Sequence, residues 1–388
     1  MTITIQGDVT PGFEPIADAF AAAFDGHPSM GAALAIRIKG ERVVNLFGGI
    51  ADERTSARWE PETASVVFSC TKGLVSILAA RLVQEGRLDY EAPVARYWPE
   101  FAAAGKGDVQ VKHLLAHKAG LSAPIVDVSP DDMLDWPTMA TLLAAQAPLW
   151  PLGSGHAYHA LTHGWLAGEV IRRVTGQSVG AFFAETIAGP LAVPAWIGLP
   201  EDAQEHVAHL QVDPALLDLW AAEAAKTTTA TPNWTYRAMT LGKALPASLV
   251  TADGGFNDPR IRSAEIPGAG GIATADALAS IWSATVTETD GVRLLAPATA
   301  ALATTVQSEG PPVFAEPPPH PRWGMGFQLD SDARHYLTPQ SFGHDGAGGQ
   351  VTFADPAAEL GFAFVTNWMM GPGDLRATRI IDALRAAL

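Results

Sequence analysis

The stretch Phe68-Ser69-Cys70-Thr71-Lys72-Gly73 lies where an extended apolar run ends and a helical pattern begins. Apolar residues at positions 74, 77, 78 and 82 predict a helix from near Ser69 to near Gly86. Ser69 and Lys72 then share one face of the first turn. The positive helix end would lower the lysine pKa, so that the neutral amine accepts the serine proton and the serine becomes a nucleophile. The alternative interpretation of the same four residues is a structural one, in which Ser69 caps the helix and Lys72 is solvated.

The composition narrows the class of protein. The chain has 388 residues, 48% of them hydrophobic and 17% charged, which indicates a soluble globular protein. A net charge of −16 argues against nucleic acid and anionic membranes as partners. Cys70 is the only cysteine, so no intramolecular disulfide can form. No signal peptide or membrane-spanning run is recognised, and we expect a cytoplasmic location; the oligomeric state is left open.

Strand patterns occur near both ends of the chain, and helical patterns fill its middle. Strands are expected over 32–39, 42–48, 323–329, 341–353 and 360–366, and a last helix over 375–388. We therefore expect an α+β fold, with an antiparallel sheet from the N- and C-terminal segments, flanking helices and a mainly helical lobe. The sheet domain is assigned to residues 1–66 and 265–388 and the helical domain to 67–264, with the active site in the crevice between them.

Two further motifs carry candidate chemistry. Tyr158 follows a glycine-rich turn at the start of an expected helix over 158–174, and its phenol could shuttle protons if nearby cations depress its pKa. The stretch Gly343-His344-Asp345-Gly346-Ala347-Gly348-Gly349 places many glycines in a strand pattern, which indicates close approach to the backbone, a ligand being one possibility. A core tyrosine and a plain hairpin turn are the alternatives for these two motifs.

Ser69-Cys70-Thr71-Lys72, then Tyr158, then His344-Asp345-Gly346 in one chain resemble the serine β-lactamase and penicillin-binding-protein superfamily. The similarity is greatest to the class C-like branch that includes the family VIII carboxylesterases, and it runs over most of the chain. The resemblance implies that Ser69 is the acylated nucleophile, that Lys72 activates it and that Tyr158 acts as a general base that later returns a proton. It also implies an oxyanion hole made by the backbone N–H groups of Ser69 and Ala347. The order of proton transfer between Lys72 and Tyr158 stays open.

Two departures from the β-lactamase pattern concern substrate recognition. The family's Tyr-x-Asn is Tyr158-His159-Ala160 here, which lacks the carboxamide that would bind an amide of the substrate. The family's Lys-Thr-Gly is His344-Asp345-Gly346, and a histidine is mostly neutral near pH 7. Both changes favour neutral esters over β-lactams. A peptidase, an amidase or a weak β-lactamase of the same superfamily, and a non-catalytic binding protein, remain the alternatives.

Substrate contacts are expected from the His344-Asp345-Gly346 triplet. Trp150, Trp234 and Trp323 are candidates for the wall of a pocket for an apolar acyl chain, although tryptophans at such positions are as often part of a core. The predicted partner is a small-molecule ester, and no cofactor is expected.

A second serine motif and a set of histidines offer other chemistry. Gly176-Gln177-Ser178-Val179-Gly180 matches the nucleophile elbow of lipases, but it follows a helix rather than a strand, so we interpret Gly176 as a helix C-cap and Ser178 as an N-cap. A metal site would need histidines that converge. His113 and His117 are expected four apart on one helix, and three more could share another face: His156, His159 and His163. Leu114 stands where a zinc peptidase needs glutamate, so no metal is expected.

Overall fold

The computed structural model describes residues 3–226 and 232–388. Within these residues, nine strands form one antiparallel sheet in the order β1-β3-β2-β13-β12-β11-β10-β9, and β4 pairs with the C-terminal end of β3. The strands are β1 (Ile5–Val9), β2 (Gly31–Ile38), β3 (Glu41–Asp52), β4 (Ala57–Arg58), β9 (Arg322–Trp323), β10 (Gln328–Leu329), β11 (Phe342–Asp345), β12 (Val351–Asp355) and β13 (Leu360–Thr366). They come from the two ends of the chain, which confirms the predicted α+β architecture.

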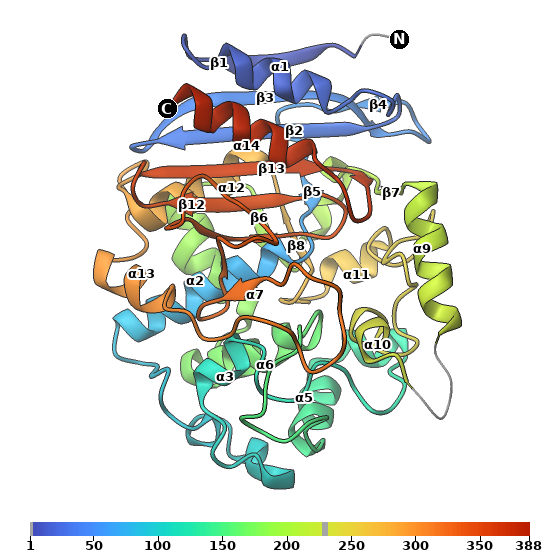
Figure 1. Cartoon of the computed structure of the whole chain (residues 1–388), viewed down its shortest axis with the longest axis vertical. Coiled ribbons are helices and arrows are strands. Elements are labelled where there is room, and N and C mark those ends of the chain that lie inside the picture. Colours follow the sequence, from blue (N-terminus) through green and yellow to red (C-terminus); the bar gives the residue numbers. More distant parts are fainter. Residues whose placement is uncertain (1–2, 227–231) are drawn as a thin grey trace.

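Helices cover both faces of this sheet. Figure 1 shows α1 (Glu14–Ala22) and α14 (Arg376–Ala387) side by side on the near face, with α12 (Ala275–Val286) behind the sheet. The near side is apolar because α1 and α14 both turn apolar stripes inward; Phe20 of α1, for example, packs edge to face on Phe364 of β13 at 6.3 Å between ring centroids. The two faces of the sheet therefore have separate cores.

The segment between the two sets of strands is mainly helical. Its longest helices are α2 (Cys70–Gln84), α5 (Trp136–Ala145), α6 (Thr162–Thr175) and α9 (Pro214–Ala225). The shorter helical segments are η1 (Val94–Arg96), η2 (Pro99–Gly105), α3 (Val111–Leu115), α4 (Pro130–Leu134), α7 (Val179–Phe183), η3 (Ala184–Ala188), α8 (Gly189–Leu191), η4 (Glu201–His206), α10 (Trp234–Thr240) and α11 (Pro259–Ser263), while α13 (Pro297–Ala303) follows α12. Most of these helices lie beyond one edge of the large sheet, and both chain termini lie toward its opposite edge (Figure 1).

Two small sheets join the helical segment to the rest. Strand β8 (Gly271–Ala273) lies between β5 (Ser65–Val66) and β6 (Ala195–Ile197), and β7 (Gln211–Val212) pairs in parallel with β14 (Trp368–Met369). The first of these sheets brings the chain just before Ser69 next to the 268–271 turn. The pairing of β5 with β8 therefore sets the position of helix α2, which follows β5 in the chain.

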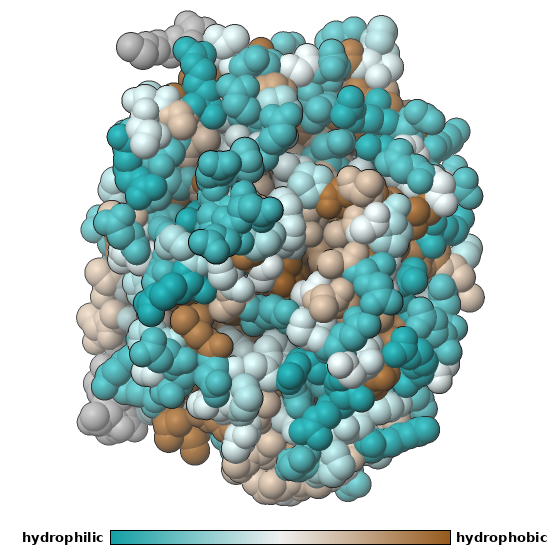
Figure 2. Space-filling model, turned by 180° about the vertical axis from the view of Figure 1, so that it is seen from behind, coloured by the Kyte–Doolittle hydropathy of each residue, from teal (hydrophilic) through white to brown (hydrophobic). Residues whose placement is uncertain are grey.

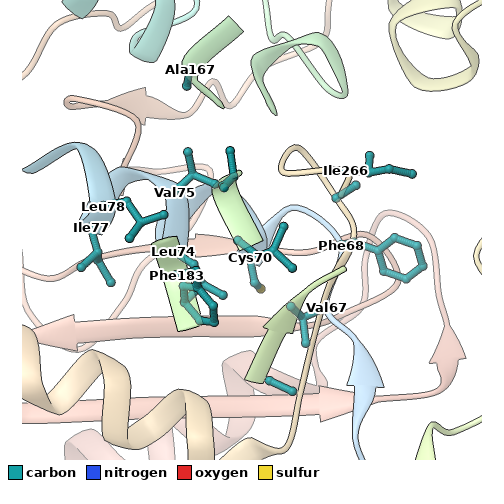
Figure 3. Close-up of a cluster of buried hydrophobic side chains, with 14 of the residues drawn as sticks. Val67, Phe68, Cys70, Leu74, Val75, Ile77, Leu78, Ala167, Phe183 and Ile266 are labelled. Carbon is teal, nitrogen blue, oxygen red and sulfur yellow. The ribbon is translucent and has the colours of Figure 1, made fainter. Parts of the chain in front are cut away.

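Helix α2 is buried on almost every side. All of residues 70–80 and Leu82 are buried, so only the last turn of this helix reaches solvent. Figure 3 shows its apolar side chains packed among neighbouring elements, including Phe183 and Ala167 from two other helices. A central helix clamped from all sides gives a rigid support for its own first turn.

The exterior is mostly polar. The rear face carries mainly hydrophilic residues, with small, separate hydrophobic patches (Figure 2). Among the described residues, no helix combines the length and the apolar character that crossing a bilayer requires.

Two predicted strands are corrected by the structure. The expected strand over 323–329 is two short strands, β9 and β10, which pair antiparallel. The expected strand over 341–353 is two strands, β11 and β12, which pair antiparallel and are joined by the glycine-rich residues 346–350. The run of glycines is therefore the turn of a hairpin, and its backbone passes close to the start of α2.

Candidate active site

Ser69 lies at the junction between strand β5 and helix α2. Phe68, directly before it, has a φ of +45°, a conformation that costs a non-glycine residue of the order of 1 kcal/mol and persists only where packing holds it. Its buried ring packs edge to face on Phe256 at 5.3 Å. Helix α2 starts at Cys70 and ends before Gly86, which has a left-handed φ of +69°, so the predicted bounds are confirmed.

Lys72 points back at the nucleophile candidate from the first turn of α2. Its Nζ lies 2.9 Å from Ser69 Oγ and 2.6 Å from each of the carbonyl oxygens of Ala160 and Gly268. The side chain is fully buried, and Ser69 makes no side-chain capping bond to the helix, which rules out a capping serine beside a solvated lysine. The residues therefore form a compact pair inside the protein.

Burial holds the pKa of Lys72 well below its usual value. The direction agrees with the sequence-based expectation, but its main cause is loss of solvation rather than the helix end. A neutral amine has two N–H donors and one lone pair, and the carbonyls of Ala160 and Gly268 can only accept hydrogen bonds. Both N–H groups are thus used, and the lone pair is left for the hydroxyl hydrogen of Ser69.

Tyr158 completes the contact set around Ser69 Oγ. Its hydroxyl donates to that atom at 2.7 Å, and its ring stacks on Trp323 with centroids 5.3 Å apart and planes 14° apart. Burial raises the pKa of Tyr158 above its usual value, so the phenol stays protonated and the condition of a pKa depressed by nearby cations is not met. The expected helix start is also wrong: α6 begins at Thr162, and Tyr158 lies in the preceding loop.

The hairpin turn after β11 brings the second oxyanion candidate to the same place. A Cβ on Gly346 would lie 2.3 Å from the carbonyl oxygen of Val67, so only glycine permits this approach to the residue two before Ser69. In the described part of the chain, the backbone N–H groups of Ser69 and Ala347 donate to no other backbone group. Free N–H groups near a nucleophile are what an oxyanion hole requires.

The buried side chain of Arg376 holds the hairpin turn at residues 346–350 in place. Arg376 is 5% exposed and donates to the carbonyl oxygens of Gly348 at 2.9 Å and Trp368 at 3.0 Å, while Asp374 accepts from its guanidinium at 2.7 Å. No sequence pattern indicates this role, because the acceptors are backbone atoms brought together only by the fold. Arg376 thus sets the path of the turn that carries Ala347.

His344 and Asp345 differ in what they face. His344 is buried, donates from Nδ1 to the carbonyl oxygen of Asp345 at 2.6 Å, and has its pKa lowered by burial to about 3, so it is neutral. Asp345 accepts hydrogen bonds from Arg334 at 2.6 Å and from the Tyr336 hydroxyl at 3.2 Å. Its carboxylate is therefore held by the protein itself, and a substrate contact from either residue stays a prediction.

Each of the three tryptophan candidates packs on another aromatic ring. Trp323 is 4% exposed and covers the phenol ring, whereas Trp150 packs edge to face on Phe314 with centroids 5.5 Å apart. Trp234 stacks on Phe314 with ring centroids 6.2 Å apart. The sequence reasoning had not singled out Phe314, which lies in a proline-rich loop where an aromatic residue gives no periodic signal.

The histidines considered as metal ligands are arranged differently from the expectation. Helix α3 ends at Leu115 and His117 has a φ of +61°, so the expected shared helix face with His113 is wrong. His117, His159 and His163 do pack together, but all three are buried and burial lowers their pKa values. Within residues 3–226 and 232–388, no group of three or more His, Cys, Asp or Glu side chains could hold a metal ion.

Ser178 has a local structural role, as expected. It is the N-cap of α7, where its Oγ accepts from Ala181 N at 3.2 Å and donates to Glu265 at 2.5 Å. Gly176 ends α6 in a left-handed conformation. The Gly-x-Ser-x-Gly match is therefore a helix–helix junction and not a nucleophile elbow.

The chain is similar to known proteins over most of its length. Residues 16–387 match the family described as Beta-lactamase. The chain is similar to the Esterase/beta-lactamase LipL of Mycobacterium tuberculosis, with 34% identity over 379 residues that span 95% of this chain and 84% of LipL. Esterase EstB of Burkholderia gladioli is 29% identical over 181 residues, 42% of this chain and 46% of EstB.

Solved structures extend the similarity to the whole fold. A family VIII carboxylesterase and a penicillin-binding protein homolog from Caulobacter crescentus each superpose with a TM-score of 0.87 at 36% identity, covering 99% of this chain and 100% of theirs. EstA from Arthrobacter nitroguajacolicus gives a TM-score of 0.84 at 30% identity, with 98% of this chain and 97% of EstA covered.

Proposed function

Because this chain belongs to the beta-lactamase family, we propose that it is a serine hydrolase that cleaves carboxylic esters through an acyl-enzyme on Ser69. The observation that carries the proposal is the convergence on one hydroxyl: Lys72 Nζ at 2.9 Å and the Tyr158 hydroxyl at 2.7 Å from Ser69 Oγ. A base and a donor on one buried serine are the arrangement that nucleophilic catalysis needs.

In acylation, Ser69 Oγ attacks the ester carbonyl carbon while its proton moves to the lone pair of neutral Lys72. The negative charge that develops on the carbonyl oxygen is stabilised by the N–H groups of Ser69 and Ala347. Collapse of this intermediate breaks the bond to the alcohol, which leaves with a proton. This proton comes from Lys72, and the Tyr158 hydroxyl, which lies beside Ser69 Oγ, is placed to pass it to the alcohol.

In deacylation, a water molecule replaces the alcohol and attacks the acyl carbon. Lys72 again accepts a proton, and the proton is returned to Ser69 Oγ as the acid leaves, so the enzyme is regenerated with no net change in charge. Protonated Tyr158 donates to Oγ in the resting enzyme and steadies it as the leaving group.

The preference for neutral esters is supported by two replaced positions. Ala160, where the family has asparagine, is buried and offers no side-chain hydrogen bond to an amide. His344, where β-lactamases have lysine, is buried and neutral, so it offers no positive charge to a carboxylate. An ester substrate without an amide or a carboxylate brings no polar group that would need either of these missing side-chain partners.

A β-lactamase activity is the second candidate, because the name of LipL combines esterase and β-lactamase. An amidase is the alternative that the sequence leaves open. Rates on an aryl ester, a chromogenic cephalosporin and a D-amino acid amide distinguish the candidates. We expect the ester to react at least about 100-fold faster than either amide, since a missing hydrogen-bonding group costs roughly 1–3 kcal/mol per unpaired partner.

The experiment that tests the proposal is mass spectrometry of the intact protein after treatment with a fluorophosphonate, followed by peptide mapping. We expect one adduct, on Ser69, in the wild type and none in Ser69→Ala, with Ser178→Ala as a matched control that still reacts. An adduct on Ser178 would overturn the assignment of the nucleophile. No adduct at all would favour a non-catalytic binding protein on this scaffold.

We also propose a division into a sheet domain (residues 1–66 and 265–388) and a helical domain (67–264), with the site between them. It is supported by the source of the sheet strands, which all lie in residues 5–58 and 322–366. A small-molecule ester is the proposed partner. A cytoplasmic location and the absence of nucleic-acid binding stay predictions from the sequence.

A further inference from the structure

A cavity is enclosed by the end of helix α12, by helix α13 and by strands β9, β10 and β11. Its volume is about 550 Å³, within the range that small-molecule sites span. We call it the α13 cavity, after the helix whose Ala300 and Thr304 form part of one wall. Helix α13 lies at the left edge of the molecule in Figure 1. Ser69, Lys72 and Tyr158 do not line the cavity, so it is separate from the candidate active site.

The floor of the α13 cavity is apolar. It is formed by Val286 at the end of α12, Leu329 of β10 and Phe342 of β11, which are exposed to 7%, 7% and 1%. Ala300 and Val306 add apolar surface on the side of α13. Apolar side chains that reach a cavity from the core give the apolar part of a ligand a surface on which to be buried.

Packed aromatic rings separate the cavity from helix α2. The ring of Phe342 packs on Phe327 with centroids 5.1 Å apart and on Trp282 with centroids 6.0 Å apart. Trp282 in turn lies against α2, since a Cβ on Gly73 would be 2.5 Å from its ring. All three rings are buried. A ligand in the α13 cavity would therefore be separated from the first turn of α2 by a layer of buried rings.

Arg293 supplies a positioned positive charge at this cavity. Its Nε donates to the carbonyl oxygen of Leu295 at 3.1 Å, and its Nη2 donates to that of Val286 at 2.9 Å. A guanidinium group has five N–H donors, so three remain once these two are used. Among the residues that the structure describes, no carboxylate lies within 4.0 Å of this guanidinium. The side chain is thus held in place with donors left for an anion.

The charges along the cavity favour an anionic ligand. The lining carries two positive side chains, Arg293 and Arg322, and one negative side chain, Glu359, whereas the whole chain has a net charge of −16. Arg322 Nε lies 3.2 Å from a carboxylate oxygen of Glu309, but the two side chains are 42% and 62% exposed, which makes this ion pair weak. Glu359 accepts from the Thr287 hydroxyl at 3.1 Å. Arg293 is therefore the group best placed to bind a carboxylate.

We propose that the α13 cavity binds a small apolar carboxylate, a molecule with one carboxylate group and an aromatic or aliphatic body. Arg293 binds the carboxylate, and the body lies on Val286, Leu329 and Phe342. This site goes beyond the proposed ester hydrolysis and does not depend on it, because none of its residues belongs to the group around Ser69.

The test is isothermal titration calorimetry with 2-naphthoate as the probe and 2-naphthamide as its neutral counterpart. In the wild type, we expect saturable binding of 2-naphthoate with a Kd of about 1 mM or tighter, the affinity that ligand efficiency allows for a molecule of this size. The amide should bind about tenfold more weakly, because hydrogen bonds between charged groups are the stronger ones. Equal affinity for the two probes, or no saturation by about 10 mM 2-naphthoate, would overturn the proposal.

Three variants locate the bound probe. Ala300→Phe fills the cavity from α13 and should weaken binding of 2-naphthoate by about tenfold or more. Ala298→Phe adds the same ring to an exposed position of that helix, outside the cavity, and should leave the Kd unchanged. Arg293→Met should weaken binding of 2-naphthoate about tenfold and leave that of 2-naphthamide within about twofold. Unchanged binding of 2-naphthoate in Ala300→Phe or in Arg293→Met contradicts the proposal, as does an equal loss in Ala300→Phe and Ala298→Phe.

Fluorophosphonate treatment separates this site from the candidate active site. Protein labelled on Ser69 should bind 2-naphthoate with the Kd of the untreated protein. Loss of binding after labelling would place the probe at Ser69 and overturn the proposal. If Ser69 is not labelled, the proposed function fails, and the variants of the α13 cavity still decide whether this cavity binds the carboxylate.

Discussion

Lys72 and Lys106 make an instructive pair, because both lysines are fully buried and both point at backbone carbonyls. Lys106 Nζ donates to the carbonyl oxygens of Ala103 at 2.8 Å, Ala144 at 2.9 Å and Gln146 at 2.6 Å. Three acceptors use all three hydrogens of an ammonium group. Burial lowers the pKa of Lys106 only to about 8, so it is mostly charged at pH 7 and joins the end of α5 to the loop after η2.

Lys72 differs from Lys106 in a single partner. Two of its neighbours are carbonyls, but the third is the hydroxyl of Ser69, which can donate as well as accept. A neutral amine can donate to both carbonyl oxygens and accept from the hydroxyl of Ser69. An ammonium group could only donate to that hydroxyl, and so could not act as its base. The proposed base therefore differs from the structural lysine in two ways: its third partner is a hydroxyl, and burial lowers its pKa further.

The largest effect should follow from Lys72→Met. Loss of the base should lower kcat/KM on an aryl ester by about 10³-fold or more, since a positioned general base contributes roughly 10²–10⁴-fold. Steady-state kinetics with active-site titration measure it. The urea midpoint should fall by no more than in Lys106→Met, because two carbonyls rather than three lose a donor. Wild-type activity in Lys72→Met would show that Lys72 is not the base and has only a structural role, like Lys106.

Tyr158→Phe should have the next largest effect. It removes the donor to Ser69 Oγ and leaves Lys72 in place, so kcat/KM should fall by about 10²-fold. Labelling of Ser69 by fluorophosphonate should slow down but continue. A loss as complete as in Lys72→Met would mean that the phenol, and not the amine, takes the serine proton.

Lys106→Met should affect stability and leave the chemistry alone. Three buried carbonyls lose their donor, which we expect to cost about 3 kcal/mol of the free energy of unfolding. Urea denaturation measures this loss, and kcat/KM at 25 °C should stay within about twofold of the wild type. A large loss of activity in a folded Lys106→Met protein would show that the two lysines are not independent.

The sequence predicts the part of this site that one helix turn contains. Ser69 and Lys72 are three residues apart, so their spacing alone places both side chains on one face. The loop position and protonated state of Tyr158 were missed, because they depend on burial under Trp323 and not on the residues beside it. The carbonyls of Ala160 and Gly268 could not be found from sequence, since every residue has one and only the fold selects them.

For the fold too, local patterns are predictable from the sequence, and features that depend on distant contacts are not. The strand pairs at the chain ends follow from alternating apolar patterns, and the predicted sheet is confirmed. The strand over 341–353 was predicted as one segment because apolar residues on both sides of the glycines hide the turn. In the described residues between about 200 and 260, helices α9 and α10 begin at the side-chain caps Asp213 and Asn233, and α10 has only seven residues, so periodicity gives little information there.

The pH dependence of Ser69 labelling tests the central claim, that Lys72 is already neutral, most directly. Burial lowers its pKa, so the neutral base is present above that lowered pKa and is lost only as the pH falls through it. Burial raises the pKa of Tyr158, which stays protonated throughout. The second-order rate constant for fluorophosphonate should therefore be constant between pH 7 and 9, an interval chosen to lie ~1.4 units or more below the usual lysine pKa of about 10.4. A rate that climbs about tenfold per pH unit across this interval would contradict the account, because the base would then have an ordinary lysine or tyrosine pKa.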